Sequence, residues 1–281
     1  MLTATSAIRI GNAGVHSTIV FDRAVRATIV RRDKLAFDTR YSPPAAGKPE
    51  KVGHVYLIVT GRYAPAVGEA VAGPVAFVLG DDEIERVSAK SRTFRTDGQT
   101  IDVLHLRFEQ HELAAPIGLA AGPLRLTPAC WDVAHRVLAA PETLGDFLDA
   151  LARDGVTHGT AKIHEEPERY RRFWDALRPL YETYGGTVSL KQLAAALDMS
   201  MRQVGRDAKD LAKTFGFGEG YRDALLILRL RMAVLLLSGP DSSVADVASA
   251  VGYGSPIAMA RAFRDARLPA PSAVQAALRG E

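Results

Sequence analysis

Three side chains near residue 200 combine residue types and a spacing that suit recognition of planar polar groups. Arg202, Gln203 and Arg206 are separated by one, three and four positions, so on a helix they fan over one face. Guanidinium and carboxamide groups form paired hydrogen bonds with base edges, arginine with guanine and glutamine with adenine. On a helix of a tandem helix-turn-helix motif, for which the evidence follows below, this pattern favours contact with bases over the alternative, a helix surface that is merely solvated.

A second group of donors lies nearer the end of the chain. Residues 255–258 read Ser-Pro-Ile-Ala and offer almost no donors, whereas Arg261 and Arg264 follow at positions suited to phosphates. Lys209 suits phosphate or solvent in the same way. We therefore predict that the first group discriminates between bases and that the second positions the protein. The predicted DNA-contacting residues are Arg202, Gln203, Arg206, Lys209, Ser255, Arg261 and Arg264.

Residues that could form a catalytic or metal site are present but are not grouped. The four histidines in the first half of the chain form no H-x-H pair and have no paired acidic partner at metal-ligand spacing, and the nucleophile-elbow, P-loop and dinucleotide-binding motifs are missing. Cys130 could be a nucleophile, but a buried small residue is the commoner case. We expect no catalytic residue, metal or cofactor; an enzyme would need a metal in the first half of the chain. These four histidines are His16, His54, His105 and His111, whereas His135, His158 and His164 are expected to be solvated in the helical linker.

The residues near position 200 are expected on the second helix of a pair. Ser189 and Gln192 form a capping-box sequence that opens a helix ending near residues 198–199. Ser200 and Gln203 form a second such sequence, which opens a helix reaching about residue 213. Two short helices joined by a tight turn, the second rich in basic residues, are typical of a helix-turn-helix unit.

The same pattern recurs downstream. Ser243 and Asp246 open a helix, and residues 252–254 form a turn in which glycine adopts a backbone conformation that other residues resist. Ser255 then caps a helix with Pro256 at its first position. We expect this last helix to turn Ile257, Met259, Ala262 and Phe263 inward.

Individual residues make the tandem pattern more specific. They are Leu193-Ala194, Leu197, Ser200 and Arg206 in the first unit, Arg229-Leu230, Ala233 and Leu236-Leu237 in the connecting helix, and Val244, Val247-Ala248, Val251-Gly252-Tyr253, Arg261-Ala262-Phe263 and Pro271 in the second. With these residues the sequence resembles the AraC/XylS family of transcription regulators over about residues 187–274. It departs from the family at Asp207-Ala208 and Met259, where an aromatic residue is usual, and at Leu268, where a glycine is usual.

The resemblance implies a two-lobed domain that binds double-stranded DNA in successive major grooves. It also implies an upstream cupin-like sensor domain for a small-molecule effector, and a homodimer formed through the helices of residues 131–152. A different class of function stays open: a cupin-like small-molecule-binding protein whose C-terminal domain is degenerate and binds DNA weakly. The donor-poor second reading helix favours that alternative.

The first half of the chain has the pattern of short strands. Residues 101, 103, 105 and 107 alternate apolar and polar side chains, which is the period of a half-buried strand. The sequence Thr-Asp-Gly-Gln at residues 96–99 predicts a hairpin between Phe94 and Ile101. Many short strands at this spacing predict a barrel or sandwich.

Helices are expected from residue 128 onward. Residues 131–140 and 142–152 form two of them, separated at Pro141, and a polar linker follows at residues 158–168. Leu144, Phe147, Leu148 and Leu151 form one apolar stripe, which either packs on its own domain or mediates self-association. The expected architecture is α+β with two domains: an all-β cupin-like barrel or sandwich over 1–126, a helical dimerisation and linker region over 127–164, and an all-α DNA-binding domain with two helix-turn-helix motifs joined by a long helix over 165–281.

Composition limits the remaining possibilities. The 281 residues carry a net charge of +3, and residues 187–281 hold 12 basic against 9 acidic residues, a modest excess for a DNA-binding protein. One cysteine excludes a disulfide framework and fits the cytoplasm. The apolar run at residues 224–237 is too short for a membrane span and contains two arginines. Because Val234 and Leu235 make that helix apolar nearly all round, we expect the sensor domain or a partner subunit to cover it.

Overall fold

The computed structural model describes residues 2–21, 25–36, 41, 52–65, 71–80, 94–95, 100–118, 121–159, 168–184, 188–215 and 220–280. The chain divides into two compact units. The first contains His16–Lys34 and Pro49–Glu165, and the second contains Leu2–Val15, Leu35–Lys48 and Glu166–Glu281. Two segments of the expected 1–126 domain therefore belong to the second unit, and the helices expected in a separate region 127–164 belong to the first.

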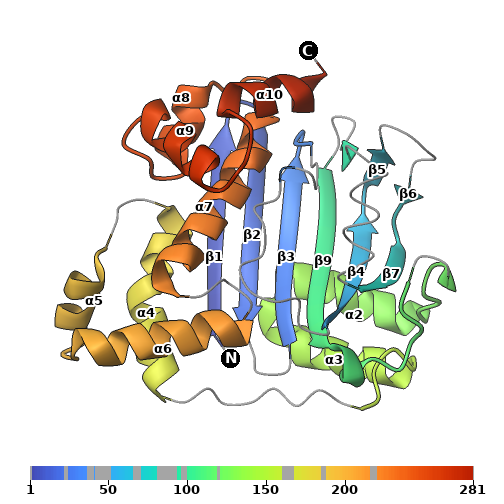
Figure 1. Ribbon diagram of the computed structural model, residues 1–281. Coiled ribbons are helices and arrows are strands. Elements are labelled where there is room, and N and C mark those ends of the chain that lie inside the picture. Colours follow the sequence, from blue (N-terminus) through green and yellow to red (C-terminus); the bar gives the residue numbers. More distant parts are fainter. Residues whose placement is uncertain are drawn as a thin grey trace. The chain divides into compact units, whose positions relative to one another are not determined.

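The secondary structure follows the predicted order of strands and then helices (Figure 1). The strands are β1 (Leu2–Ile10), β2 (Ala13–Phe21), β3 (Val25–Asp33), β4 (Val52–Thr60), β5 (Arg62–Pro65), β6 (Val71–Ala72), β7 (Val75–Gly80), β8 (Phe94–Arg95) and β9 (Thr100–Glu109). The helices are η2 (Gln110–Glu112), α2 (Pro128–Ala139), η4 (Pro141–Thr143), α3 (Leu144–Arg153), α4 (Glu168–Thr183), α5 (Leu190–Ala196), α6 (Met201–Phe215), α7 (Tyr221–Leu237), α8 (Val244–Ala250), α9 (Pro256–Asp265) and α10 (Pro271–Arg279). The chain is therefore of the α+β class.

The larger of the two sheets is antiparallel and is built around β9. The strand order is β1-β2-β3-β9-β4-β7, and a smaller sheet has the order β6-β5-β8. Within the described residues this order does not close into a ring, so the expected barrel or sandwich is not confirmed. The predicted hairpin between Phe94 and Ile101 is wrong in its pairing, because β8 pairs with β5. Its turn, residues 96–99, lies outside the described residues.

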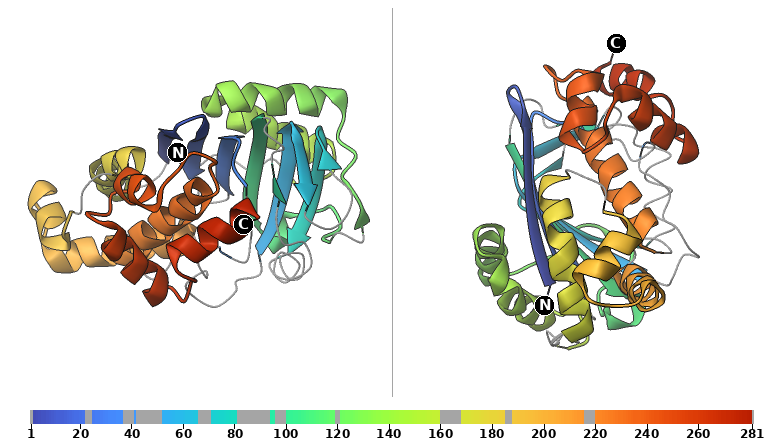
Figure 2. Two further views of the ribbon diagram at one scale, coloured as in Figure 1. Left: turned by 90° about the horizontal axis from the view of Figure 1, so that it is seen from above. Right: turned by 90° about the vertical axis from the view of Figure 1, so that its left-hand side faces the viewer.

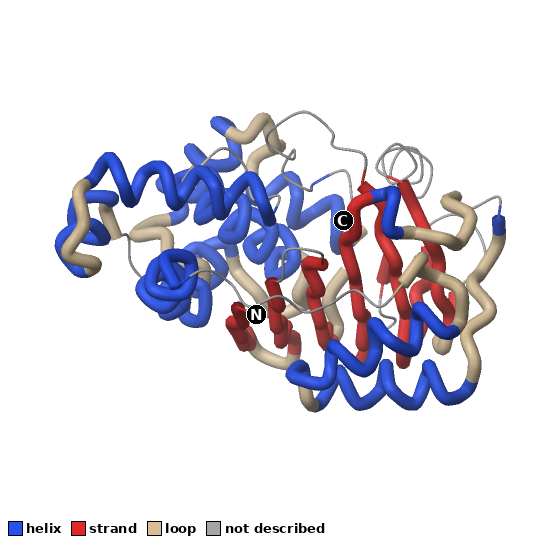
Figure 3. The backbone as a smooth tube through the Cα atoms, turned by 90° about the horizontal axis from the view of Figure 1, so that it is seen from below, coloured by secondary structure: helices blue, strands red, loops and turns tan. Residues whose placement is uncertain are grey.

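One face of this sheet carries the core of the first unit. Inward residues of β4 and β9, such as Leu57 and Leu104, are fully buried against α2 and α3, which run along the sheet (Figure 3). The stripe Leu144, Phe147, Leu148 and Leu151 is at most 2% exposed and belongs to this core. Self-association through the stripe is therefore wrong, because the sheet of the same chain already covers it.

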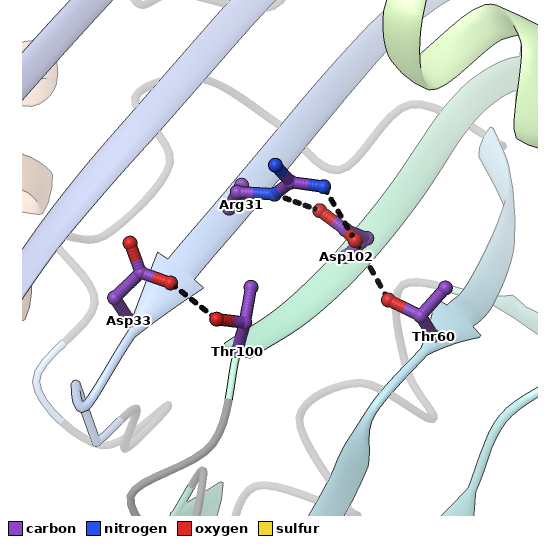
Figure 4. Close-up of polar contacts among 5 residues, drawn as sticks. All are labelled: Arg31, Asp33, Thr60, Thr100 and Asp102. Carbon is purple, nitrogen blue, oxygen red and sulfur yellow. Dashed lines mark hydrogen bonds and ion pairs between the residues drawn. The ribbon is translucent and has the colours of Figure 1, made fainter.

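An ion pair joins β3 to β9 near the first residues of β9 (Figure 4). Arg31 Nε and Nη2 donate to the two carboxylate oxygens of Asp102 at 2.7 and 3.1 Å, and Thr60 donates to the same carboxylate at 2.6 Å. Burial by itself would raise the pKa of Asp102, but the hydrogen bonds from Arg31 and Thr60 and the charge of Arg31 outweigh it and hold the pKa below 3.8. The charged form of Asp102 is therefore the one that stabilises the fold.

Asp102→Asn is expected to lower the free energy of unfolding by about 1–2 kcal/mol at pH 7, because it removes charge-assisted hydrogen bonds from a buried carboxylate. Since the folded pKa is depressed, the contribution of Asp102 is complete well above pH 3.8 and is lost as the pH falls through the folded value. Urea unfolding at pH 7 and at about pH 3 checks both points. Asp33→Asn, at a site that accepts a hydrogen bond from Thr100 nearer solvent, is the control. Equal losses in the two variants would contradict the role of Asp102.

The second unit is built around α7. Figure 2 shows this helix running from the pair α5–α6 to α8, α9 and α10, and it contacts α6, α8, α9 and α10. The N-terminal strand is part of this unit, because α4 packs against β1 and Trp174 Nε1 donates to the Thr3 carbonyl at 2.9 Å. The backbone N–H of Ala36 donates to Ser238 Oγ, just beyond α7, at 2.8 Å. The expected all-α domain thus includes a β-strand.

Candidate nucleic-acid interface

Two helix pairs in the second unit share the same start. Ser189 before α5 and Ser243 before α8 each accept a hydrogen bond from the backbone of the third helical residue. In return, the backbone N–H of each serine donates to a side-chain oxygen of that third residue, Gln192 Oε1 at 2.8 Å and Asp246 Oδ2 at 3.3 Å, which completes a capping box in both helices. The capping box predicted at Ser189 is confirmed, the helix predicted to open at Ser243 begins with a capping box as well, and both first helices have seven residues.

The turns of the two pairs are also alike. Asp198, with φ of 51°, and Gly252, with φ of 77°, each lie two residues beyond the end of the first helix in the left-handed region. The next backbone N–H, of Met199 or Tyr253, reaches back to the carbonyl of Ala194 or Ala248 at 2.9 and 2.8 Å. This is the hydrogen-bond pattern of a glycine-type helix end. The turn predicted at residues 252–254 is confirmed, and the first pair reproduces it with an aspartate.

A serine caps the second helix of each pair. Ser200 Oγ accepts from Gln203 N at 3.2 Å, and Ser255 Oγ accepts from Ala258 N at 3.1 Å. Pro256 occupies the first helical position, as predicted. The second bond of the predicted capping box, from the Ser200 backbone to the Gln203 side chain, is replaced, because the Gln203 carboxamide binds Asp207 and Arg206. Both second helices therefore begin at a defined residue.

Arg229 of α7 lies between the end of α4 and the turn of the second pair. The residue is 8% exposed, and its guanidinium donates to the Tyr184 carbonyl at 3.4 Å and lies 5.9 Å from the centre of the Tyr253 ring. A Cβ built on Gly252 would lie 1.7 Å from the same Tyr184 oxygen. Backbone therefore contacts backbone at this point, and Arg229 holds the second turn against the segment that leads into the first pair.

The predicted reading face of α6 is exposed and internally connected. Arg202, Arg206 and Lys209 are exposed, and Gln203 is half-buried. Gln203 Nε2 donates to buried Asp207 at 2.9 Å, and Arg206 donates to the Gln203 carbonyl oxygen. Gln203 thus uses both polar groups of its amide within the helix, so its geometry suits orienting Arg206 better than reading a base itself. Asp207, one of the residues at which the sequence departs from the AraC/XylS pattern, is thus the residue that holds Gln203.

The exposed face of α9 differs from the expected one at a single residue. Met259 and Phe263 are fully buried, as predicted, but Ile257 is 67% exposed. The reason is helical geometry, because a residue two positions before Met259 points to the opposite side of the helix. Ile257 shares its face with Arg261 and Arg264, and Arg264 forms an exposed ion pair with Asp265 at 3.7 Å. The hydroxyl oxygen of Ser255 accepts the capping hydrogen bond from the backbone N–H of Ala258.

Gly205 lies in the middle of α6, where glycine is unfavourable. A Cβ added there would meet only Leu190 Cδ2, at an ordinary 3.8 Å. Gly205→Ala is therefore expected to raise the free energy of unfolding by about 0.5–1 kcal/mol through helix propensity. Thermal and urea unfolding measure this change, and the first-pair contact with Leu190 should survive. A lower stability would mean that α5 and α6 pack more tightly than described.

The first unit brings together two histidines that are far apart in sequence. His54 Nδ1 and His105 Nε2 are 2.9 Å apart, and the rings of His105 and Tyr56 stack with centres 4.1 Å apart. Antiparallel pairing of β4 with β9 places Tyr56 opposite His105. The sequence pattern did not reveal this cluster, since its spacing arises across strands. Within the described ranges, no group of three or more His, Cys, Asp and Glu side chains could hold a metal ion.

Cys130 is 1% exposed and belongs to the core of the first unit. Burial and the neighbouring charge of Asp154 raise the pKa of its thiol to about 12. A thiol in this state is a poor nucleophile. The interpretation of Cys130 as a buried structural residue is therefore confirmed.

The apolar surface of α7 is covered. Val234 and Leu235 are 3% and 9% exposed, so the expectation that this helix is covered on more than one side is confirmed. The residue after α7, Ser238, accepts from Ala36, and Asp241 accepts from the backbone N–H of Asn12 at 3.4 Å. In the described part of the chain, no helix is both long and apolar enough to cross a membrane.

Comparisons with known proteins give similar structures without a sequence match. No family model and no curated protein matches the sequence. ToxT from Vibrio cholerae is 8% identical with a TM-score of 0.39, covering 89% of this chain and 98% of ToxT. A DNA-binding transcriptional dual regulator from Escherichia coli K-12 is 18% identical with a TM-score of 0.33, covering 43% and 100%. The AraC-like transcriptional activator CuxR is 14% identical with a TM-score of 0.30, covering 82% and 85%. Likeness at these scores assigns no function, which has to follow from the chain's own residues.

Proposed function

We propose that this chain is a sequence-specific, DNA-binding transcription regulator of the AraC/XylS type. The observation that carries the proposal is the repeated construction of α5–α6 and α8–α9. Each pair has a capping box, a left-handed turn residue and a serine cap on the second helix. Each second helix also exposes arginines, which suit base edges and phosphates.

We propose that α6 enters the major groove with Arg202 and Arg206 toward the bases. Gln203, held by Asp207, orients Arg206 through its carbonyl oxygen. Lys209, Arg261 and Arg264 contact phosphates, while Ser255 acts through the helix cap. This arrangement uses the same residues that the sequence predicts, with Gln203 moved from direct contact to positioning.

Arg206→Ala is expected to relax the preference at one guanine and to lower affinity for the preferred site about tenfold, because a bidentate contact is lost. Sites selected from random DNA by the full chain and by the variant measure the preference. Lys209→Ala is the matched control on the same helix, and it should weaken binding to all sequences alike and reduce the salt slope by about one. Selection of the same site by Arg202→Ala, Arg206→Ala and wild type would contradict the assignment.

The salt dependence of binding separates this function from the alternative. A protein that neutralises phosphates loses affinity steeply as salt rises. We expect a steep slope on DNA selected from its own upstream region. A degenerate domain in a small-molecule-binding protein would give weak binding with little preference between sequences.

The first unit is the proposed sensor, and the sheet face with His54, Tyr56 and His105 is the proposed place for a small-molecule effector. The side chains offer aromatic surface and imidazole nitrogens, which suit a planar or anionic ligand. The effector and the cupin-like description remain proposals. Mass spectrometry of the protein purified under native conditions tests whether a ligand is carried.

We further propose a cytoplasmic homodimer that uses the outer faces of α2 and α3. Trp131 and Leu138 are seven residues apart on α2, and both remain partly exposed while touching the core. Sedimentation of wild type and of Leu138→Glu tests this contact. A wild-type monomer at micromolar concentration would contradict it.

A further inference from the structure

Two large apolar side chains stand out on the surface of the second unit. Of the large hydrophobic residues that the structure describes, only Met201 and Ile257 are exposed, by 53% and 67%. Single exposed apolar residues are ordinary on a protein surface. Both, however, lie in the first turn of the second helix of a pair: Met201 is the first residue of α6, and Ile257 is the second residue of α9. Each helix pair thus presents one apolar group at the tip of its second helix.

The neighbours of these side chains are cationic. Ile257, Arg261 and Arg264 are four and three positions apart, so they share the exposed face of α9. Met201 is followed directly by exposed Arg202. An apolar tip with arginines further along the same helix matches a polyanion that also offers an apolar group. Double-stranded DNA fits this description, because its major groove displays the 5-methyl group of thymine between two rows of phosphates.

We propose that Ile257 and Met201 contact thymine methyl groups in the major groove. The inference rests on the proposed function and extends it. The first residues of a recognition helix are those that reach base edges, and an apolar side chain there distinguishes thymine from cytosine by its methyl group. The second pair therefore reads sequence without hydrogen-bond donors in its first turn. This assignment changes the role expected for α9, from positioning alone to reading as well.

Deoxyuridine provides the test, since it differs from thymine only in lacking the methyl group. The full chain first selects its preferred site, and each thymine of that site is then replaced singly by deoxyuridine. One replacement is expected to weaken wild-type binding about fourfold, the effect of one buried methyl group. The same replacement should leave the affinity of Ile257→Ala unchanged, and Ile257→Ala should bind the thymine site as weakly as wild type binds the deoxyuridine site. Met201→Ala gives the same comparison for α6.

Arg264→Ala is the matched control on the same face of α9. It is expected to weaken binding to both sites alike and to flatten the salt slope. Ile257→Thr keeps one branched methyl and should retain part of the discrimination. Because Ile257 is exposed, these variants should unfold at the temperature of wild type.

The outcomes separate the two proposals. Absence of salt-dependent DNA binding overturns both the function and the inference. Salt-dependent binding in which every deoxyuridine site weakens wild type and Ile257→Ala equally overturns the inference alone. The inference is also overturned if Ile257→Ala loses the same affinity, relative to wild type, on thymine and deoxyuridine sites. That result would indicate that Ile257 contacts a protein partner instead.

Discussion

Gly252→Ala is expected to lower the free energy of unfolding by about 3 kcal/mol or more. Two costs add at this position. A non-glycine residue at φ of 77° costs about 1–2 kcal/mol. The new Cβ would also lie 1.7 Å from the Tyr184 carbonyl oxygen and 2.8 Å from its carbon, so backbone of α8–α9 or of the α4 end must move. The movement adds a packing cost of about 1–3 kcal/mol.

Gly254→Ala is the matched control two residues away. A Cβ at Gly254 meets nothing within 4 Å, and its φ is not in the left-handed region. Its stability should stay within about 0.5 kcal/mol of wild type. Urea unfolding compares the two variants, and DNA binding of Gly252→Ala should fall with its folded fraction. Similar stabilities for the two alanine variants would mean that the turn does not rest on Tyr184.

Local features of the second unit could be predicted from the sequence because their causes are local. A capping box needs a serine and a polar residue three positions later, and the pair Ser189–Gln192 forms it as expected; Ser243 and Asp246, which are predicted to open a helix, form one too. The turn at Gly252 follows from glycine's access to positive φ. Asp198 was not identified as its counterpart, because aspartate adopts that conformation less often and leaves no comparable sequence signal.

Features that depend on distant residues could not be predicted in the same way. The pattern of Leu144–Leu151 indicates an apolar face but not what covers it. It is therefore equally compatible with packing inside the chain and with self-association, and the covering strands β4 and β9 are distant in sequence. His54 and His105 meet only through strand register. The placement of β1 against α4 depends on contacts such as Trp174 with Thr3, which are 171 residues apart. The apolar side chain of Ile257 predicts an inward position, whereas its angle on α9 directs it outward.

The tyrosines of the second unit lead to a further expectation, in alkali. Burial raises the pKa of Tyr253 to about 12, against the opposing charge of Arg229, and burial raises the pKa values of Tyr184 and Tyr221 as well. A raised pKa in the folded state means that the neutral phenol is favoured there. The resulting stability is complete below about pH 10 and is lost as the pH rises through the folded value. Wild type should therefore lose on the order of 2 kcal/mol between pH 9 and 12 through Tyr253 alone.

Two phenylalanine variants test this account. Among the residues that the structure describes, the buried Tyr253 hydroxyl has no hydrogen-bond partner, whereas the Tyr221 hydroxyl donates to the Val188 carbonyl. Tyr253→Phe should leave stability at pH 7.5 unchanged or raise it by up to about 1 kcal/mol, and it should reduce the alkaline loss. Tyr221→Phe should cost about 1 kcal/mol at pH 7.5, because it leaves a carbonyl without its donor. Urea unfolding at pH 7.5, 9 and 11.5, with tyrosine absorbance to follow ionisation, distinguishes the two variants. If Tyr253→Phe loses as much free energy of unfolding at high pH as wild type does, other groups govern stability in alkali.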